Sequence, residues 1–320
     1  MAAMATAVFA SCSNEDGLPQ SNYPADNVVR IMTSVDGMNT RASYGNSADK
    51  LKSFGFCIKN ANSEKYTYDN IKVSQKGYNW IPATQMLWQN STTAVDILAY
   101  APYQETTEDA NGKVKVFGKT DYAFSVKEDQ SNAEDYSSDL IVFKQTGFTP
   151  VSELNTSKAV EVAFTHLLSQ LNLIIELRDQ FNTNNNTVTK GFVTDVKVNG
   201  TIISSKVDFS ASPISVQVDG TQTAAITPET TGFTPAENAT AHAVFNYSAI
   251  VIPQTVAAGN FSISFKVNNT EYIWTATDAV TFESGKKHEL HLLAGKDVVQ
   301  GGAISAKPWG KETITEKETD

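Results

Sequence analysis

The sequence predicts an all-β protein of two β-sandwich domains in tandem, and three observations lead to this prediction. Only 19% of the residues are charged, and the other polar residues are rich in Ser, Thr and Asn, which suit sheet faces and turns better than helix surfaces. Short apolar or alternating segments recur along the chain with polar turns between them, a pattern typical of β-sandwiches. A length of 320 residues exceeds that of a typical single domain, so we expect two.

Shifts in composition indicate where these domains begin and end. Residues 13–27 carry glycine and prolines among polar neighbours, which is the composition of a linker. Residues 146–158, with Gly147 and Pro150, are the expected connection between the two domains. The expected parts are a signal and linker at 1–27, sandwiches at 28–150 and 151–310, and a charged tail at 311–320.

The N-terminus has the layout of a lipoprotein signal. Residues 1–10 are small and apolar, and residues 9–12 (Phe-Ala-Ser-Cys) resemble a bacterial lipobox, so Cys12 is the expected lipidation site and first residue of the mature chain. No Lys or Arg precedes Arg30, so the positive region that opens a secretory signal is missing, which indicates a start further upstream or a trimmed sequence. The alternative is an unstructured N-terminus with an incidental cysteine.

The first strand is expected at residues 28–35. This segment is β-branched, partly alternating, and followed by the turn signal Asp36–Gly37. Further short strands of the first half are expected at residues 51–59, 66–73, 95–100, 114–117, 122–126 and 140–143. Their regular spacing favours a sandwich over a parallel α/β sheet.

The second half has the clearest alternation. Apolar residues share one face through residues 160–168 and continue in the opposite phase through 171–177, so we expect a bulge or short turn at Ser169–Gln170. Alternation at 261–267 and 272–276, around the turn Asn268–Asn269, predicts a hairpin with one buried face. Further strands are expected at residues 193–198, 214–218, 247–252 and 290–293.

Charge and cysteine content exclude several classes of protein. The formal net charge is -10, and Lys and Arg form no cluster, which argues against nucleic-acid partners. No apolar run approaches the ~18 residues of a membrane span, so membrane attachment is expected only through the lipid on Cys12. Cys57 lies in an apolar strand segment and is expected to be a buried free thiol.

The sequence contains little material for catalysis or metal binding. His288 and His291 are three residues apart, which places them on opposite faces of a strand, where they cannot share one ion. His166 lies on the apolar face of its strand and is expected to be buried and hydrogen-bonded to the backbone. No nucleophile elbow, zinc-protease motif or phosphate-binding loop occurs. We therefore expect no catalytic residue, no metal site and no cofactor.

Seven segments resemble a known family in the same order along the chain. They are residues 40–42, Trp88 with 95–103, 139–141, 164–171, 250–255, 285–288 and 304–309. Together they resemble the fimbrillin family, the Mfa-like and FimA-like pilus subunits of Bacteroidota that build type V pili, over roughly residues 28–310.

The resemblance implies two transthyretin-like β-sandwiches and export as a lipoprotein acylated at Cys12. It also implies cleavage after Arg41, which leaves Ala42 as the new N-terminus and removes the strand at 28–35. That loss would leave unpaired backbone groups and an uncovered apolar stripe, until a strand from another pilin subunit fills the gap. The residues of the complementation strand are Val28, Val29, Ile31, Thr33 and Val35.

The expected function is therefore a fimbrial subunit, or an accessory or tip adhesin, exposed at the cell surface as an outer-membrane lipoprotein. The expected partners are other pilin subunits and a host or bacterial surface ligand. After Trp309 only Ile314 is strongly apolar, which favours an accessory, tip or anchor role over a stalk role. The alternative is a glycan-binding lipoprotein of a polysaccharide uptake system, with Trp80, Trp88 and Tyr103 as sugar platforms.

Overall fold

The computed structural model describes residues 22–35, 50–105, 116–182 and 188–309, and nearly all of the regular secondary structure in these residues is β-strand. The all-β prediction is confirmed at this level. Cys12, Arg41 and Ala42 lie outside the described residues. Within the described part of the chain, no helix is long and apolar enough to cross a membrane.

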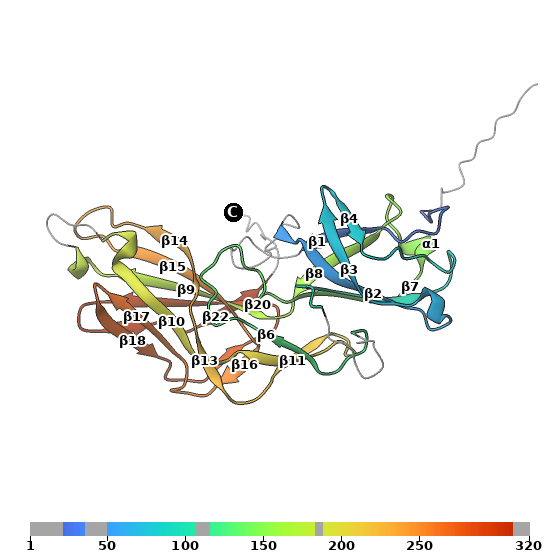
Figure 1. The fold of residues 1–320 in the computed structure, drawn as a ribbon. Coiled ribbons are helices and arrows are strands. Elements are labelled where there is room, and N and C mark those ends of the chain that lie inside the picture. The colour runs from blue at the N-terminus through green and yellow to red at the C-terminus, as the bar shows by residue number, and fades with distance from the viewer. Residues whose placement is uncertain (1–21, 36–49, 106–115, 183–187, 310–320) are drawn as a thin grey trace, which may run out of the picture.

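Strands between residues 31 and 166, mostly from the first half of the chain, build a seven-stranded sheet at one end of an elongated molecule (Figure 1). Its strand order is β1-β8-β7-β5-β2-β3-β4, so the first and fourth strands form its two edges. The strands are β1 (Ile31–Val35), β2 (Ser53–Lys59), β3 (Tyr68–Lys76), β4 (Asn79–Pro82), β5 (Val95–Ala101), β7 (Ile141–Phe148) and β8 (Val160–His166).

The second half of the chain builds a six-stranded and a four-stranded sheet at the other end, with smaller sheets nearby (Figure 1). The six-stranded sheet contains β9 (Ser169–Leu177), β14 (Glu229–Thr234), β15 (Ala243–Val251), β20 (Lys286–Ala294), β21 (Val299–Gly301) and β22 (Ser305–Pro308). The four-stranded sheet contains β10 (Val193–Ile202), β13 (Thr223–Ile226), β17 (Ser262–Val267) and β18 (Thr270–Thr275). A three-stranded sheet contains β6 (Tyr122–Ser125), β11 (Ser204–Asp208) and β12 (Ser215–Val218), and β16 (Gln254–Val256) pairs with β19 (Val280–Phe282).

The central strands of the seven-stranded sheet are buried on both faces. In β5, Ile97 and Ala99 belong to the core cluster of the first half, whereas Leu98 and Tyr100 belong to the larger cluster that continues into the second half. A strand covered on both sides reads as a continuous apolar run rather than as an alternation, which explains the sequence of residues 95–101. Cys57 is buried within this region as a free thiol, as the sequence predicts.

The seven-stranded sheet continues past the expected connection at residues 146–158. This segment carries the short helix α1 (Pro150–Glu153) and joins β7 to its neighbour β8 within one sheet. The chain leaves the sheet at Leu167–Leu168, and β9 starts in the six-stranded sheet at Ser169. The change of phase thus occurs two residues before the expected position, because β8 and β9 belong to different sheets.

The hairpin predicted in the second half is confirmed. β17 and β18 pair in antiparallel fashion, with Val267 opposite Thr270 and two residues between them. Asn268 and Asn269 have φ values of 46° and 66°, so both occupy the left-handed region that a type I′ turn requires. Ile263 and Phe265 are buried on the inner face of the hairpin.

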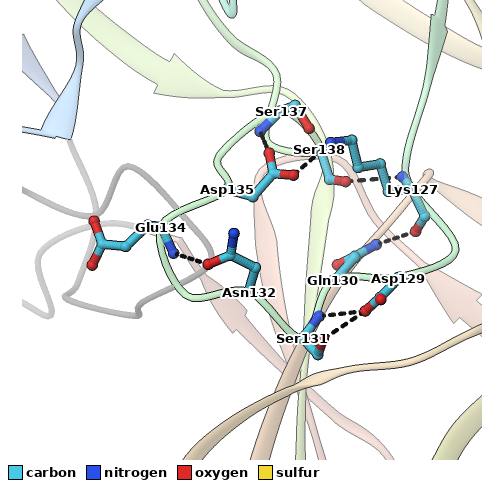
Figure 2. A network of polar contacts seen from close by, with 9 residues as sticks. All are labelled: Lys127, Asp129, Gln130, Ser131, Asn132, Glu134, Asp135, Ser137 and Ser138. Carbon is cyan, nitrogen blue, oxygen red and sulfur yellow. Dashed lines mark hydrogen bonds and ion pairs between the residues drawn. The ribbon is translucent and has the colours of Figure 1, made fainter.

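The loop between β6 and β7 is held by a network of polar contacts among its own residues (Figure 2). Gln130 is buried, and its side-chain amide exchanges hydrogen bonds with the backbone of Ile250 at 2.9 and 2.7 Å. The Lys127 amide donates to Ser138 Oγ at 2.9 Å, and Gln130 Nε2 also donates to the Lys127 carbonyl at 3.0 Å. The side chain of Gln130 therefore pairs with the backbone at the end of β15 in the way that an adjacent strand would.

Candidate functional site

The first strand has a buried face and an exposed face. Val29, Ile31 and Val35 are buried in the core cluster of the first half, and Met32 and Ser34 point outward. This period-two arrangement follows directly from the alternation of the sequence. The ladder begins at Ile31, three residues after the predicted start of the strand, and Val28 makes only an isolated bridge with Leu87.

The strand β1 lies at the sheet edge and pairs in parallel with β8. The register places Ile31 opposite Val160, Thr33 opposite Val162 and Val35 opposite Phe164. On the other side of β8, the described ladder with β7 comprises only two pairs, at His166 and Thr165. Among the described strands, β1 is thus the ladder partner of residues 160–164 of β8.

The residues just before β1 form backbone hydrogen bonds with a second segment, which lies on the side of the chain away from β8. The Val29 amide donates to the Met86 carbonyl at 3.0 Å, and the Trp88 amide donates to the Asn27 carbonyl at 2.8 Å. Strand β1 and the residues leading into it therefore cover two different backbone segments, one on each side.

An ion pair orders the entry to the strand. Arg30 Nη2 lies 2.7 Å from Asp26 Oδ2, and the Val28 amide donates to Asp26 Oδ1 at 3.1 Å. The hydrogen bonds from Arg30, followed by the one from Val28, lower the pKa of Asp26 to about 2. Both side chains of the pair are largely exposed, so the pair orients the chain more than it stabilises the fold.

A groove of about 770 Å³ separates β1 from β4, the opposite edge of the seven-stranded sheet. Figure 1 shows these two edges close to each other. Three of the lining side chains are large, apolar and exposed, namely Met32, Tyr78 and Ile81. The sheet therefore curves until its edges face one another, and apolar side chains remain accessible beside β1.

The structure brings together all five residues predicted for the complementation strand. Val29, Ile31 and Val35 are buried, and Val28 and Thr33 are half-buried. The Thr33 hydroxyl is itself buried and has no hydrogen-bond partner among the described residues. Sequence reasoning missed this feature, since alternation places Thr33 on the inner face but does not show what surrounds its hydroxyl.

The aromatic residues considered as sugar platforms do not form an exposed platform together. Trp88 is buried and stacks on Phe148, with ring centroids 5.7 Å apart. Trp80 is half-buried with an edge contact to Phe54, and the Lys72 ammonium lies over the Tyr103 ring. The glycan-binding alternative therefore has no support from Trp88.

The histidines of the second half differ in burial and in their hydrogen-bond partners. His288 is buried and accepts a hydrogen bond from the Glu283 amide at 3.0 Å, and burial lowers its pKa. His291 lies on the opposite face of β20, as its spacing predicts, and contacts Glu176 at 2.6 Å. His242 contacts the same carboxylate. Spacing in the sequence could not reveal this cluster of Glu176, His242 and His291, because the three residues come from separate parts of the chain.

His166 is buried as expected, but its partner is a side chain rather than the backbone. Its Nδ1 atom lies 2.9 Å from the buried carboxylate of Asp139, and Trp309 stacks on its ring. The expectation of a backbone partner was wrong because β8 ends beside residue 139, which precedes β7. Among the described residues, no group of three or more His, Cys, Asp or Glu side chains could hold a metal ion.

Comparison with known proteins identifies the family. Residues 40–309 match the fimbrillin-like family, and no curated protein matches the sequence significantly. A candidate cell adhesion protein of Bacteroides ovatus has a similar fold, with a TM-score of 0.60, 14% identity, and coverage of 90% of this chain and 100% of that chain. A candidate cell adhesion protein of Bacteroides uniformis has a TM-score of 0.56 and 16% identity, and the match covers 89% of this chain and 100% of that chain. A fimbrial protein of Bacteroides vulgatus has a TM-score of 0.53 and 18% identity, and the match covers 88% of this chain and 99% of that chain. The chain belongs to the fimbrillin-like family, whose members are structural fimbrial or adhesion proteins rather than enzymes.

Proposed function

We propose that this protein is a fimbrial subunit, or an accessory or tip adhesin, that assembles by exchanging its first strand for a strand of another subunit. Its partners are other pilin subunits, together with a host or bacterial surface ligand. Membership of the fimbrillin-like family supports the fimbrial role. The position of β1 supports the mode of assembly.

One observation carries this proposal: β1 is a short edge strand that pairs with the first five residues of β8, Val160 to Phe164. Without β1, residues 160–164 would lose their ladder partner among the described strands, and the buried Val160, Val162 and Phe164 would lose part of their cover. Unpaired backbone groups and uncovered apolar surface both carry a free-energy cost. A strand donated by a neighbouring subunit removes both costs.

The proposal includes maturation and anchoring steps. Cleavage after Arg41 releases β1 and leaves Ala42 at the N-terminus, and a lipid on Cys12 holds the precursor at the outer membrane. The two halves, at residues 28–150 and 151–310, are proposed to be transthyretin-like sandwiches in tandem. Two core clusters and several small sheets are compatible with such halves, although the seven-stranded sheet includes β8 from the second range.

The test combines controlled cleavage with a measurement of assembly. An endoprotease specific for arginine can cut the full chain at Arg30, Arg41 or Arg178. We expect a cut after Arg41, followed by a ladder of oligomers on a native gel. Arg41→Lys should abolish both results, and the matched control Arg178→Lys should change neither. Complete cleavage after Arg41 that leaves a monomer would contradict the proposal.

The anchoring step has its own measurement. N-terminal sequencing and mass spectrometry of protein recovered from cells should give an acylated Cys12 in the precursor and Ala42 in the processed form. A chain recovered from the cytosol with its first residue intact would contradict the proposed export.

A further inference from the structure

We infer that the buried hydroxyl of Thr33 weakens the binding of β1 to β8, so that another strand can displace β1, and that the displacing strand carries Val or Ile opposite Val162. The inference rests on the proposed strand exchange and adds a sequence requirement for the donor. It follows from one buried hydroxyl group in the middle of an otherwise apolar face.

The inner face of β1 has one polar position. Val29, Ile31 and Val35 fill it with apolar side chains, and Thr33 lies between the last two, opposite Val162. The Thr33 Oγ1 atom is buried, and no described residue forms a hydrogen bond with it. A hydroxyl group taken out of water without a partner destabilises the state that buries it.

Two other buried hydroxyl groups at strand positions show how such a group can be satisfied. Ser205 Oγ donates to the Phe124 carbonyl at 2.8 Å, and Ser169 Oγ donates to the Glu283 carbonyl at 2.7 Å. In both cases a backbone carbonyl of another segment accepts the hydrogen bond. The hydroxyl of Thr33 has no such acceptor among the described residues, so its burial is not compensated.

The shape of the position specifies the replacement. Valine has the shape of threonine with a methyl group in place of the hydroxyl, so it fits the same space without leaving a cavity. A strand with Val at this position keeps every ladder bond to β8 and removes the unsatisfied group. Ile adds one methylene, and the groove beside Thr33 provides room for it. Such a strand binds more tightly than β1, which favours exchange in the forward direction.

The test measures displacement of the native strand by synthetic peptides. The full chain is cut after Arg41 with the arginine-specific endoprotease, and release of the N-terminal fragment is followed by size-exclusion chromatography and mass spectrometry. The displacing peptides have the sequence of residues 27–36, either unchanged or with Thr33→Val. We expect the Thr33→Val peptide to reach half-release at about fivefold lower concentration, which is the gain expected for removing one unsatisfied hydroxyl.

Two controls separate this effect from a general gain in apolarity. A peptide with Ser34→Val carries the same kind of change on the outward face, and it should match the unchanged peptide. Introducing Thr33→Val into the protein itself should make its own fragment about fivefold harder to displace by either peptide. The peptide series also tests the inference if the protein variant does not fold.

The outcomes distinguish the inference from the proposed function. Equal displacement by the unchanged peptide and the Thr33→Val peptide, with normal release of the fragment, would overturn the role of Thr33 and leave strand exchange intact. An equal gain from Ser34→Val would overturn it too, because the position would then be irrelevant. Failure of every peptide to release the fragment would overturn strand exchange and, with it, the inference.

Discussion

At the scale of single residues, several buried polar and aromatic side chains hold separate segments of the chain together. Trp309 is buried and lies parallel to the ring of His166, with centroids 3.8 Å apart and an interplanar angle of 3°. His166 in turn contacts the buried carboxylate of Asp139. These three side chains bring together the residue that follows β22, the end of β8 and the segment just before β7.

The stacked tryptophan leads to a prediction about stability. Trp309→Ala should lower the free energy of unfolding by about 3 kcal/mol, because it removes a large buried ring that the structure cannot fully replace. Denaturant unfolding followed by circular dichroism measures the change. Ser305→Ala, at an exposed position of β22, the strand that ends just before Trp309, is the control and should have little effect. A loss of similar size in both variants would show that the ring contact is not the cause.

At the scale of elements, the entry to β1 depends on the pair formed by Asp26 and Arg30. The pKa of the Asp26 carboxyl is lowered from 3.8 to about 2, chiefly by its hydrogen bonds with Arg30. Because the folded-state pKa is below the ordinary value, the stabilising contribution is complete above pH 3.8. It is lost as the pH falls through about 2.

This shift can be measured directly. In an NMR titration of the side-chain carboxyl carbons, Asp26 should titrate near pH 2, and Arg30→Gln should move its midpoint toward 3.8. The matched control is Lys266→Gln, which removes a cation that pairs with Asp195 instead. An unchanged Asp26 midpoint in the Arg30→Gln protein would assign the shift to another group.

At the scale of the whole molecule, one sheet joins segments from both halves of the chain. Strand β8, at residues 160–166, connects β7 to β1 and supplies Val160, Val162 and Phe164 to the core of the first half. A fragment that stops before β8 therefore lacks the strand against which β1 pairs.

This architecture predicts how truncated chains behave. A fragment of residues 22–168 should resist proteolysis more than a fragment of residues 22–150, since only the longer one contains β8. Limited proteolysis with a fixed amount of chymotrypsin compares the two, with the full chain as the reference. Equal protection of both fragments would show that residues 28–150 are sufficient for the first domain.

Much of the local structure was accessible from the sequence. The alternation Val29, Ile31, Val35 identified the buried face of β1, and Asn268–Asn269 identified the turn of the β17–β18 hairpin. These features depend on side-chain period and on which residues tolerate positive φ, and both are properties of a few neighbouring residues. Weakly patterned strands, such as β4, β11 and β22, were missed, because they are short and mostly lack a buried stripe.

The sequence alone determined that the chain is all-β, that residues 28–35 alternate, and that Cys57 is buried. Tertiary structure alone decided that β1 pairs with β8, more than one hundred residues away, and that Thr33 buries a hydroxyl without a partner among the described residues. The physical reason is that periodicity specifies which side of a strand faces the core. Neighbouring strands and the partners of each buried polar group follow from packing between distant segments.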